Sequence, residues 1–439
     1  MKRTQASSDP REAAWRALCD YERRHPPWDP LLHRTLKGLQ GPDRGLAAEI
    51  LTGTLRHRRH IDAAIERAMR RERKEADLTV WNLLRVGAYQ ILHLDRVPDH
   101  ASVNETVGLA KRHTPRAAGF VNAGLRALTR GVDLDSLPLA IRHSLPDEIL
   151  SAMESLLPAD EIEAAAESMN DPGPLGLRLN PLIAPPEETR QGVEEAIGQP
   201  LKAHPLIPDA WTCERSHLTA LEPFLDRGMI AVQDPASQLV GLLVHPQPGQ
   251  RIVDLCAAPG GKAAHLAALV GGDASILATD RDRDRLRDLR LNIERLGARC
   301  VEAVEWGMAE MLMASPEPDA ILVDAPCSGW GTVRHRPDLK WRTHDLREQG
   351  ARQLRLLETA APHLEPGGAL VYSVCSFLPE ETTQVIGTFL ESDPRYAIQD
   401  AREALPESIH GLVGPDGSVR TWPHLHGCDG FCAVRMVRR

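Results

Sequence analysis

The stretch from Arg251 to Leu269 constrains the fold of this chain most, because a strand pattern changes into a helix pattern through a tight loop. The run Arg251-Ile252-Val253-Asp254 ends in an acid, and small residues, one Pro and two Gly follow. The apolar segment Ala263 to Leu269 is typical of a helix. A second strand pattern, Ser275 to Asp280, again ends in an acid. This order predicts a parallel β-α-β unit, in which ligands lie at the carboxyl ends of the strands.

The loop of this unit predicts a nucleoside-containing cofactor. Its small residues allow the backbone to approach a ligand closely, and Asp280 can accept hydrogen bonds from ribose hydroxyls. The loop lacks the G-x-G-x-x-G pattern, and its Gly-Gly-Lys lacks the remainder of a P-loop, so a pyrophosphate is not indicated. S-adenosylmethionine fits these features. From the pattern alone, a nicotinamide cofactor or a purely structural loop remains open. The candidate loop residues are Cys256, Ala257, Ala258, Pro259, Gly260, Gly261 and Lys262.

Further strand and helix patterns predict a doubly wound α/β core. An amphipathic helix is expected at 283–296 and a third strand at about 299–304. A fourth strand, 320–324, leads into Cys327, and a fifth, 369–373, leads into Cys375. Strands in this order lie side by side in such a sheet. Both cysteines should therefore converge on the ligand crevice.

Two thiols beside a methyl donor indicate a particular reaction. A lone Cys at a strand end is commonly a small buried residue, but a pair at adjacent ends favours catalysis. Carbon-5 of a pyrimidine accepts a methyl group only after a thiolate has added at carbon-6. Asp324 can bond the polar edge of a cytosine and, once protonated, relieve charge at ring nitrogen 3. The residues alone do not decide whether Cys327 or Cys375 is the nucleophile.

The first 130 residues predict an all-α bundle. Ser8 or Asp9 can cap a first helix with Pro10 in its first turn, and helical periodicity recurs at about 44–56, 60–70, 78–94, 100–113 and 116–129. This part holds 24 Lys and Arg against 15 Asp and Glu, although the whole chain carries a net charge of −9. The clusters at 56–60 and 70–74 suggest a polyanion contact. The alternative is a solvated basic surface.

Between the bundle and the core, the sequence predicts two smaller parts. Residues 133–172 read as a helical linker, with helices at 146–157 and 159–169. Residues 173–228 read as a small α/β subdomain with a strand at 175–180 and a helix at 186–197. In that strand Arg178 and Asn180 should face away from Leu177 and Leu179, toward solvent or RNA. The expected domains are therefore 1–132, 133–172, 173–228 and 229–439.

Composition narrows the class of protein. No run of 18 apolar residues occurs, and Met1 to Gln5 lacks the character of a signal peptide, so we expect a cytoplasmic protein without a membrane partner. The eight cysteines fit reduced thiols. Cys428 and Cys432 are spaced C-x-x-x-C without a second pair, so no metal site is expected. We also expect a monomer.

Two family resemblances extend this interpretation. Residues 8–130 resemble the NusB-type RNA-binding helical domain. The core resembles the Nop/Sun RNA cytosine-5 methyltransferases, and together the two resemblances span essentially the whole chain. The first rests on Arg11 to Ala14, Val80 to Ile91 and Phe120 to Arg126. The second rests on Asp254 to Lys262, Asp280, Asp324 to Ser328, Arg336 to Trp341, Ser373 to Ser376, Pro379 to Glu381 and Asp429 to Phe431.

The second resemblance implies specific roles. It makes Cys375 the nucleophile and Cys327 the thiol that assists product release, and it places the 256–262 loop, Asp280 and Asp324 around S-adenosylmethionine and the base. Relatives carry Gly-Asp-Gly where this chain has Glu305-Trp306-Gly307, so either Glu305 replaces the Asp or Trp306 stacks on the adenine.

The implied substrate is one cytosine of 16S ribosomal RNA or of a small-subunit assembly intermediate. Two alternatives remain: the same chemistry on tRNA or another rRNA site, and a non-catalytic RNA-binding assembly factor.

Overall fold

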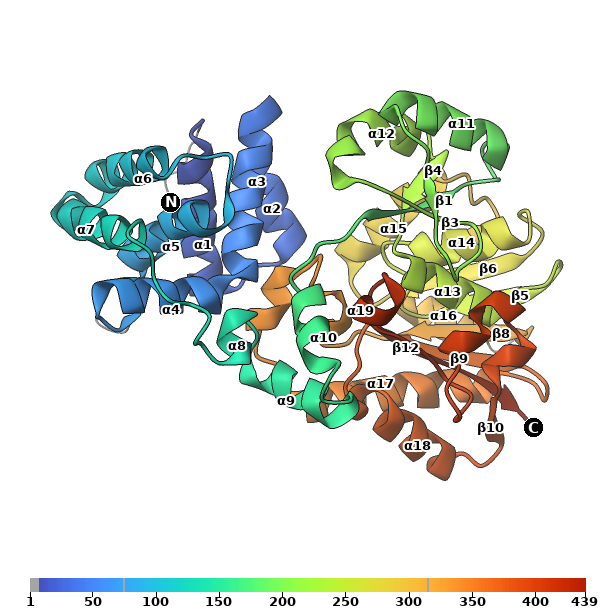
Figure 1. Ribbon diagram of the computed structural model, residues 1–439. Coiled ribbons are helices and arrows are strands. Elements are labelled where there is room, and N and C mark those ends of the chain that lie inside the picture. Colours follow the sequence, from blue (N-terminus) through green and yellow to red (C-terminus); the bar gives the residue numbers. More distant parts are fainter. Residues whose placement is uncertain (1–7, 74–75, 314–315) are drawn as a thin grey trace. The chain divides into compact units, whose positions relative to one another are not determined.

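The computed structural model describes residues 8–73, 76–313 and 316–439, and Figure 1 traces the chain. The chain divides into two compact units. One comprises residues up to Asp171 together with Val333–Thr343, and the other comprises Pro172–Thr332 and His344–Arg439. Two parts of the sequence predictions lie outside the described residues. They are Met1 to Gln5, which the signal-peptide prediction used, and Lys74 of the second basic cluster.

The first unit is helical, as the sequence predicts. Its helices are α1 Pro10–Arg24, α2 Trp28–Leu36, α3 Gly41–Arg56, α4 Arg58–Met69, α5 Leu78–His93, α6 Asp99–His113, α7 Ala118–Leu128, α8 Leu139–Arg142, α9 Asp147–Leu156 and α10 Ile162–Ser168. Asp9 is the N-cap of α1, and its side chain accepts hydrogen bonds from the backbone N–H groups of Arg11 and Glu12. Asp9 is therefore the cap of the two predicted candidates, and Pro10 lies in the first turn as predicted.

Helix α2 was not predicted, because the Pro-rich sequence before and within it resembles a loop. Pro27 is its N-cap, and Pro30 lies in its first turn. Neither residue costs a helical hydrogen bond there, since the first N–H groups of a helix have no partner within the helix. Trp28 and Leu31 of α2 are buried in the helical core.

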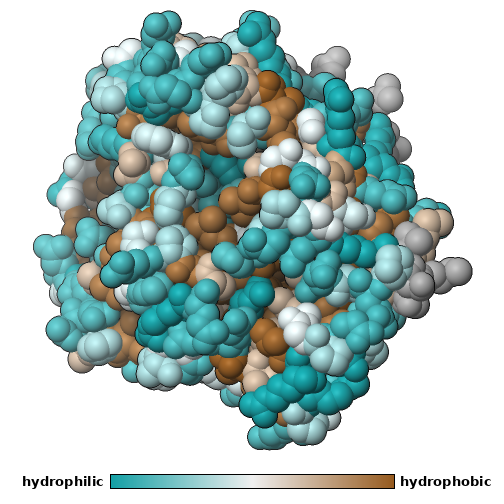
Figure 2. All heavy atoms as spheres, turned by 90° about the vertical axis from the view of Figure 1, so that its right-hand side faces the viewer, coloured by the Kyte–Doolittle hydropathy of each residue, from teal (hydrophilic) through white to brown (hydrophobic). Residues whose placement is uncertain are grey.

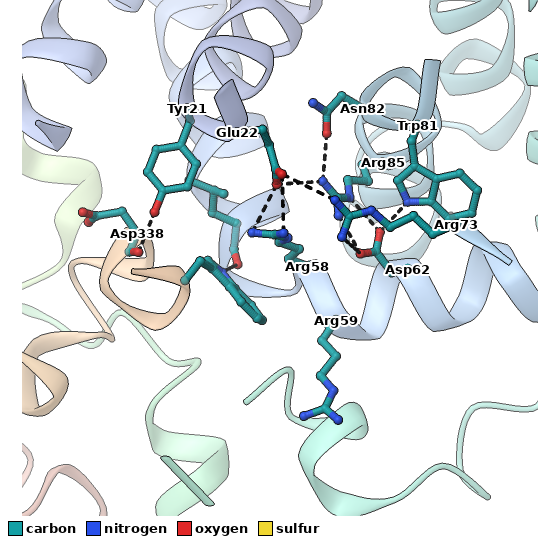
Figure 3. Close-up of polar contacts among 12 residues, drawn as sticks. Tyr21, Glu22, Arg58, Arg59, Asp62, Arg73, Trp81, Asn82, Arg85 and Asp338 are labelled. Atoms are coloured by element: carbon teal, nitrogen blue, oxygen red, sulfur yellow. Dashed lines mark hydrogen bonds and ion pairs between the residues drawn. The ribbon is translucent and has the colours of Figure 1, made fainter. Parts of the chain in front are cut away.

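A buried network of charges joins α1, α4 and α5 (Figure 3). Arg85 is 1% exposed, and its guanidinium lies 2.6 Å from Asp62 Oδ2 and 3.0 Å from Glu22 Oε1. Trp81 Nε1 donates to Asp62 Oδ1 at 2.7 Å. Burial by itself raises the pKa of Asp62, but the Arg85 charge outweighs it and the pKa is lowered. The network therefore holds ionised groups inside the bundle.

This network corrects the predicted role of the first basic cluster. Arg56 is only 7% exposed, and the Arg58 side chain is 16% exposed and lies 3.1 Å from Glu22. Arg59 pairs with Asp147 at 2.6 Å. Arg56 and Arg58 are thus structural groups of the bundle rather than phosphate-contacting surface residues. The local sequence showed their charge but not their distant partners, the Arg334 carbonyl for Arg56 and Glu22 for Arg58.

The short segment 333–343 folds as part of the helical unit, although 161 residues separate Asp171 from Val333 along the chain. Tyr21 Oη donates to the Asp338 carbonyl at 2.7 Å, and Trp341 Nε1 donates to the Leu55 carbonyl at 2.7 Å. Lys340 is buried, its Nζ lies 2.6 Å from Asn170 Oδ1, and burial lowers its pKa well below the usual value. The sequence did not predict this placement.

The second unit is α/β. Its first elements, β1 Leu175–Leu179, α11 Pro186–Ile197, β2 Lys202–Ala203, β3 Ala210–Cys213, α12 Leu218–Asp226 and β4 Ile230–Val232, include a small sheet in the order β2-β3-β1-β4. The predicted strand and helix are both present. The expected exposure of Arg178 and Asn180 is wrong, since they are 3% and 1% exposed.

Both residues are buried because they bind groups from other elements of the unit. Asn180 Nδ2 donates to the carbonyls of Gly228 and Leu296, each at 2.8 Å. Arg178 Nε donates to Gln233 Oε1 at 2.8 Å, and burial lowers the pKa of Arg178 to about 10. The alternation in the strand is real, but both of its faces are covered.

The larger sheet has the order β10-β12-β9-β8-β5-β6-β7, with β11 paired to β12. The strands β7, β6, β5, β8 and β9 are parallel, as predicted, and β12 runs antiparallel to β9. The bounds are α13 Pro235–Val244, β5 Arg251–Asp254, α14 Gly261–Leu269, β6 Ser275–Asp280, α15 Arg283–Arg295, β7 Val301–Glu305, α16 Trp306–Met313, β8 Ala320–Asp324, α17 Leu346–Ala360, β9 Ala369–Val374, α18 Thr383–Ser392, β10 Tyr396–Gln399, β11 Val419–Thr421, α19 Pro423–His426 and β12 Phe431–Arg438.

Helices cover both faces of this sheet. Ile252, Leu322 and Val371 pack with residues of α13, α14 and α15 on one face. Val253 and Ile321 pack with residues of α16, α17 and α18 on the other. The result is a three-layer α/β/α arrangement in which the carboxyl ends of the parallel strands share one edge.

The surface is mainly hydrophilic on the face that Figure 2 shows, with hydrophobic side chains in scattered patches. Among the described residues, no helix combines the length and the apolar character that spanning a membrane needs.

We predict that Arg85→Met lowers the free energy of unfolding of the helical unit by about 3–5 kcal/mol, because Asp62 and Glu22 would each lose their shortest ion pair inside the bundle. Thermal and urea unfolding of the full chain measure this loss. Arg24→Met is the matched control: Arg24 is 69% exposed and pairs with Asp20 at 3.4 Å, so its loss should cost less than about 1 kcal/mol. Equal losses in the two variants would contradict the structural role of the network.

Candidate active site

Asp324 lies at the centre of the polar groups at the carboxyl edge of the larger sheet. It ends β8 and stands opposite Ser373 of β9 in the parallel register. Its Oδ1 accepts a hydrogen bond from Ser373 Oγ at 2.7 Å, and its Oδ2 lies 2.7 Å from Lys262 Nζ. Burial by itself lowers the pKa of Lys262, but Asp324 outweighs that effect and raises it. Lys262 therefore stays charged.

The two predicted cysteines lie together at this edge. Cys327 Sγ and Cys375 Sγ are 3.3 Å apart, which confirms that the ends of β8 and β9 bring them together. The contact with Cys375, followed by burial, raises the pKa of Cys327 well above the usual value. Two adjacent thiols resist double ionisation, so Cys327 is held as a protonated thiol.

A buried glutamate that the sequence analysis left without a role fixes the cysteine loops. Glu381 is fully buried, and it accepts hydrogen bonds from Ser328 N at 2.7 Å and from Ser328 Oγ at 2.5 Å. Gln353 Nε2 donates to the Pro326 carbonyl at 3.0 Å, and Tyr372 Oη donates to the Glu381 carbonyl at 2.6 Å. These contacts from α17, β9 and the 379–381 turn hold the two cysteine loops. Only the Pro-Glu-Glu sequence could have indicated Glu381.

The 256–262 loop is held from α15. Gly260 has φ +101°, and a Cβ there would come 2.7 Å from Leu289 Cδ1, so only glycine fits. Asn292 Nδ2 donates to the Pro259 carbonyl at 2.9 Å, and Arg285 Nη2 donates to the Ala258 carbonyl at 2.6 Å. The sequence analysis assigned neither residue a role. These contacts fix the loop where it leads into α14.

Three aspartates give this edge an excess of negative charge. Asp254, at the end of β5, is fully buried, and neither of its oxygens has a well-aligned hydrogen bond among the described residues. Burial, followed by the charge of Asp324, raises its pKa to about 7. Asp280 Oδ1 accepts from Asp282 N at 3.0 Å, and its Oδ2 lies 3.3 Å from Arg285 Nη1. Lys262 and Arg285 balance only part of this charge, so the edge suits a cationic ligand.

The two candidates for the adenine contact lie beside Asp280. Glu305 is its partner in the β6–β7 register, and the Glu305 side chain is 58% exposed and 3.5 Å from Arg283. The Arg281 guanidinium lies 4.4 Å from the ring centroid of Trp306. Both stand at the correct edge, and the choice between them stays a prediction.

Comparisons with known proteins agree with both predicted parts. Residues 8–130 match the model of the NusB family, and residues 241–437 match the model described as 16S rRNA methyltransferase RsmB/F. The chain is 31% identical to a probable ribosomal RNA small subunit methyltransferase B of Synechocystis over 98% of this chain and 99% of that protein.

Two further relatives support these matches. The ribosomal RNA small subunit methyltransferase B of Salmonella paratyphi A is 34% identical over 90% of this chain and 91% of its own. The crystal structure of PH0851 shares the fold, with a TM-score of 0.81, 24% identity and 100% coverage of both chains.

We predict that Asp254→Asn stabilises the ligand-free protein more at pH 8 than at pH 5. The folded pKa of about 7 exceeds the unfolded value of about 3.9, so stability contributed by the protonated carboxyl is full below about pH 4 and is lost as the pH rises through 7. Asparagine cannot ionise. The difference in melting temperature between variant and wild type should therefore grow with pH, whereas the exposed control Asp273→Asn should show a constant difference. A constant difference for Asp254→Asn would refute the raised pKa.

Proposed function

We propose, because the chain belongs to the RsmB/F family of 16S rRNA methyltransferases, that it methylates carbon-5 of a cytosine in small-subunit ribosomal RNA with S-adenosylmethionine. The observation that carries the cytosine chemistry is the pair of thiols, 3.3 Å apart, beside Asp324. RNA binding alone requires neither thiol. A non-catalytic assembly factor is therefore the weaker alternative.

The charges at the sheet edge support the choice of cofactor. S-adenosylmethionine carries a sulfonium and an ammonium group, and it supplies an electrophilic methyl group when bound. Asp254 and Asp280 offer carboxylates to its cationic and hydroxyl groups, and the 256–262 loop offers its backbone. A cation beside Asp254 would also offset the cost of ionising that buried carboxyl.

The resemblance to the Nop/Sun methyltransferases supports different roles for the two thiols. We assign Cys375 as the nucleophile that adds to carbon-6 of the cytosine, which makes carbon-5 nucleophilic. Cys327, which the adjacent thiol keeps protonated, is a poor initial nucleophile. Once the Cys375 sulfur is bonded to carbon-6, the Cys327 thiol gives its proton to water, and the resulting thiolate takes the carbon-5 proton. The electrons of the carbon–hydrogen bond then form the carbon-5–carbon-6 double bond and expel the Cys375 sulfur as a thiolate. Lys262 and Ser373 orient Asp324 toward the polar edge of the base.

Separate removal of the two thiols tests this assignment. Cys375→Ala should be inactive and form no covalent complex, because carbon-6 is never attacked. Cys327→Ala should methylate and then stall, so that a denaturant-resistant protein–RNA adduct accumulates only with S-adenosylmethionine. Gel electrophoresis with labelled 16S rRNA from a strain that lacks the enzyme measures the adduct. Bisulfite sequencing of RNA from the same strain, with and without the wild-type gene, locates the target cytosine.

Cys300→Ala serves as the control, since Cys300 packs against the core away from the site, and it should behave as wild type. An adduct from Cys375→Ala and none from Cys327→Ala would reverse the assignment. Activity without an adduct in both variants would exclude covalent catalysis. A bisulfite signal restored in another RNA would identify that RNA as the substrate instead.

We also predict that Asp280→Ala weakens S-adenosylmethionine binding about tenfold or more, because the ribose would lose a charge-assisted hydrogen bond. Titration calorimetry measures the dissociation constant. Asp288→Ala is the control, an exposed aspartate of α15, and it should bind as wild type does. Unchanged affinity in a folded Asp280→Ala protein would exclude the ribose contact.

The RNA-contacting surface of the helical unit should be the groove between α1 and α2 rather than the first basic cluster. This groove of about 730 Å³ is lined by Arg16, Arg23, Arg24, Arg34 and Lys37, with Asp20 as its acid. Asp20 already pairs with Arg24 and Arg34, which leaves the groove strongly positive. Such a surface attracts a polyanion.

The double variant Arg23→Glu, Lys37→Glu should weaken RNA binding and reduce the slope of log K against log salt by about one for each phosphate that the variant no longer binds. Filter binding over a range of salt concentrations measures both quantities. The control, Arg96→Glu with Arg130→Glu, makes the same charge change at exposed positions of the same unit. If the control and test variants lose RNA affinity equally, RNA binding depends on the net charge of the unit rather than on this groove.

A further inference from the structure

Three histidines lie together near the junction of α3 and α4 and the C-terminal end of α5. His57 separates α3 from α4, His60 lies in the first turn of α4, and His93 is the last residue of α5. One ring nitrogen from each lies within 4.8 Å of the other two. The rings of His57 and His93 stack with centroids 4.1 Å apart, and the ring of His60 meets that of His93 edge-on at 5.5 Å.

The nitrogens of this cluster are not engaged by protein groups. Among the described residues, none of the three imidazoles makes a side-chain hydrogen bond, and His93 Nε2 is buried without a partner. A buried polar nitrogen normally finds a partner, and its absence calls for a ligand, a water or an ion. All three side chains are half-buried, so a small ion can reach them.

The spacing fits a metal ion. Zinc binds imidazole nitrogen at about 2.0–2.1 Å, which in tetrahedral geometry separates two ligand nitrogens by about 3.3 Å. The present separations of up to 4.8 Å exceed this by about 1.5 Å, so metal binding must bring the nitrogens closer and open the stack of His57 on His93. Three histidines leave the fourth zinc position to water.

The surroundings decide which kind of metal fits. Neutral imidazole is the commonest metal ligand in proteins, and it suits zinc, copper and nickel ions. No carboxylate belongs to the cluster among the described residues, so Mg²⁺ and Ca²⁺, which prefer oxygen ligands, do not fit.

We propose that His57, His60 and His93 form a binding site for a borderline transition-metal ion such as Zn²⁺ in the helical unit, independently of the methyltransferase site. The sequence analysis expected no metal, because it considered only Cys428 and Cys432. His57 and His60 are three residues apart, but His93 comes from another helix and meets them only in the fold. A bound ion would join the start of α4 to the end of α5, where the N-cap residue His57 makes no capping hydrogen bond with its side chain.

Zinc binding to the full-length, tag-free protein tests the proposal. After chelator treatment, calorimetry with Zn²⁺ should show a site that is at least tenfold weaker in His60→Gln and in His93→Gln. His100→Gln, an exposed histidine of α6, is the matched control and should bind as wild type does. Zn²⁺ should raise the melting temperature, EDTA should reverse the rise, and Mg²⁺ should have no effect.

Cobalt distinguishes this site from the thiols of Cys327 and Cys375, because thiolate ligands give Co²⁺ an intense near-ultraviolet absorption that imidazole ligands do not give. The expected spectrum lacks that band. Circular dichroism confirms that the variants are folded, and two separate histidine variants guard against the failure of one. Three results would each overturn the proposal: no zinc binding, equal zinc binding in wild type and both histidine variants, or a thiolate band for the bound ion. The three rings would then be an aromatic stack without a ligand.

Discussion

The ion pair between Lys262 and Asp324 is the contact on which the α/β site depends. A lysine and an aspartate brought out of water cost several kcal/mol each unless they neutralise one another, and their 2.7 Å contact provides that neutralisation. The pair also ties the end of the cofactor loop to the strand that carries Cys327. Asp254, fully buried nearby, lacks such a partner. Lys262 and Asp324 therefore stabilise each other, whereas the Asp254 carboxyl lacks a partner. A cationic ligand would gain the most binding free energy beside Asp254.

The sequence predicted the parallel part of this unit well because local patterns determine it. Helix α11 was predicted at the bounds that the structure shows, and the chain order of β8 and β9 predicted that these two strands lie side by side in a doubly wound sheet. That order brought Cys327 and Cys375 together before any contact was known. The antiparallel β12 was not predicted, since its pairing with β9 depends on residues far away in the chain.

Charged residues were the main source of error. Arg58, Arg85 and Arg178 carry the same side chain as any surface arginine, and nothing in their neighbours reveals a partner such as Glu22, which lies dozens of residues away. Periodicity predicted that Arg178 opposes Leu177, yet it could not show that both faces of β1 are covered. In the same way, Glu381 and Gln353 act through contacts across the fold. Sequence patterns thus predict which residues share a face more reliably than what covers that face.

The segment 333–343 bears on how far the two units are separable. The chain enters the helical unit a second time a few residues after Cys327 and returns before α17, so three covalent crossings connect the units rather than one. Trp341, Lys340 and the backbone carbonyl of Asp338 all bind groups of the helical unit. A cut at Asp171 would leave segment 333–343 in the second fragment, without the helical unit on which its apolar and charged side chains pack. The protein is therefore poorly suited to modular exchange: a domain swap that respects its architecture must transplant two separate pieces of sequence together.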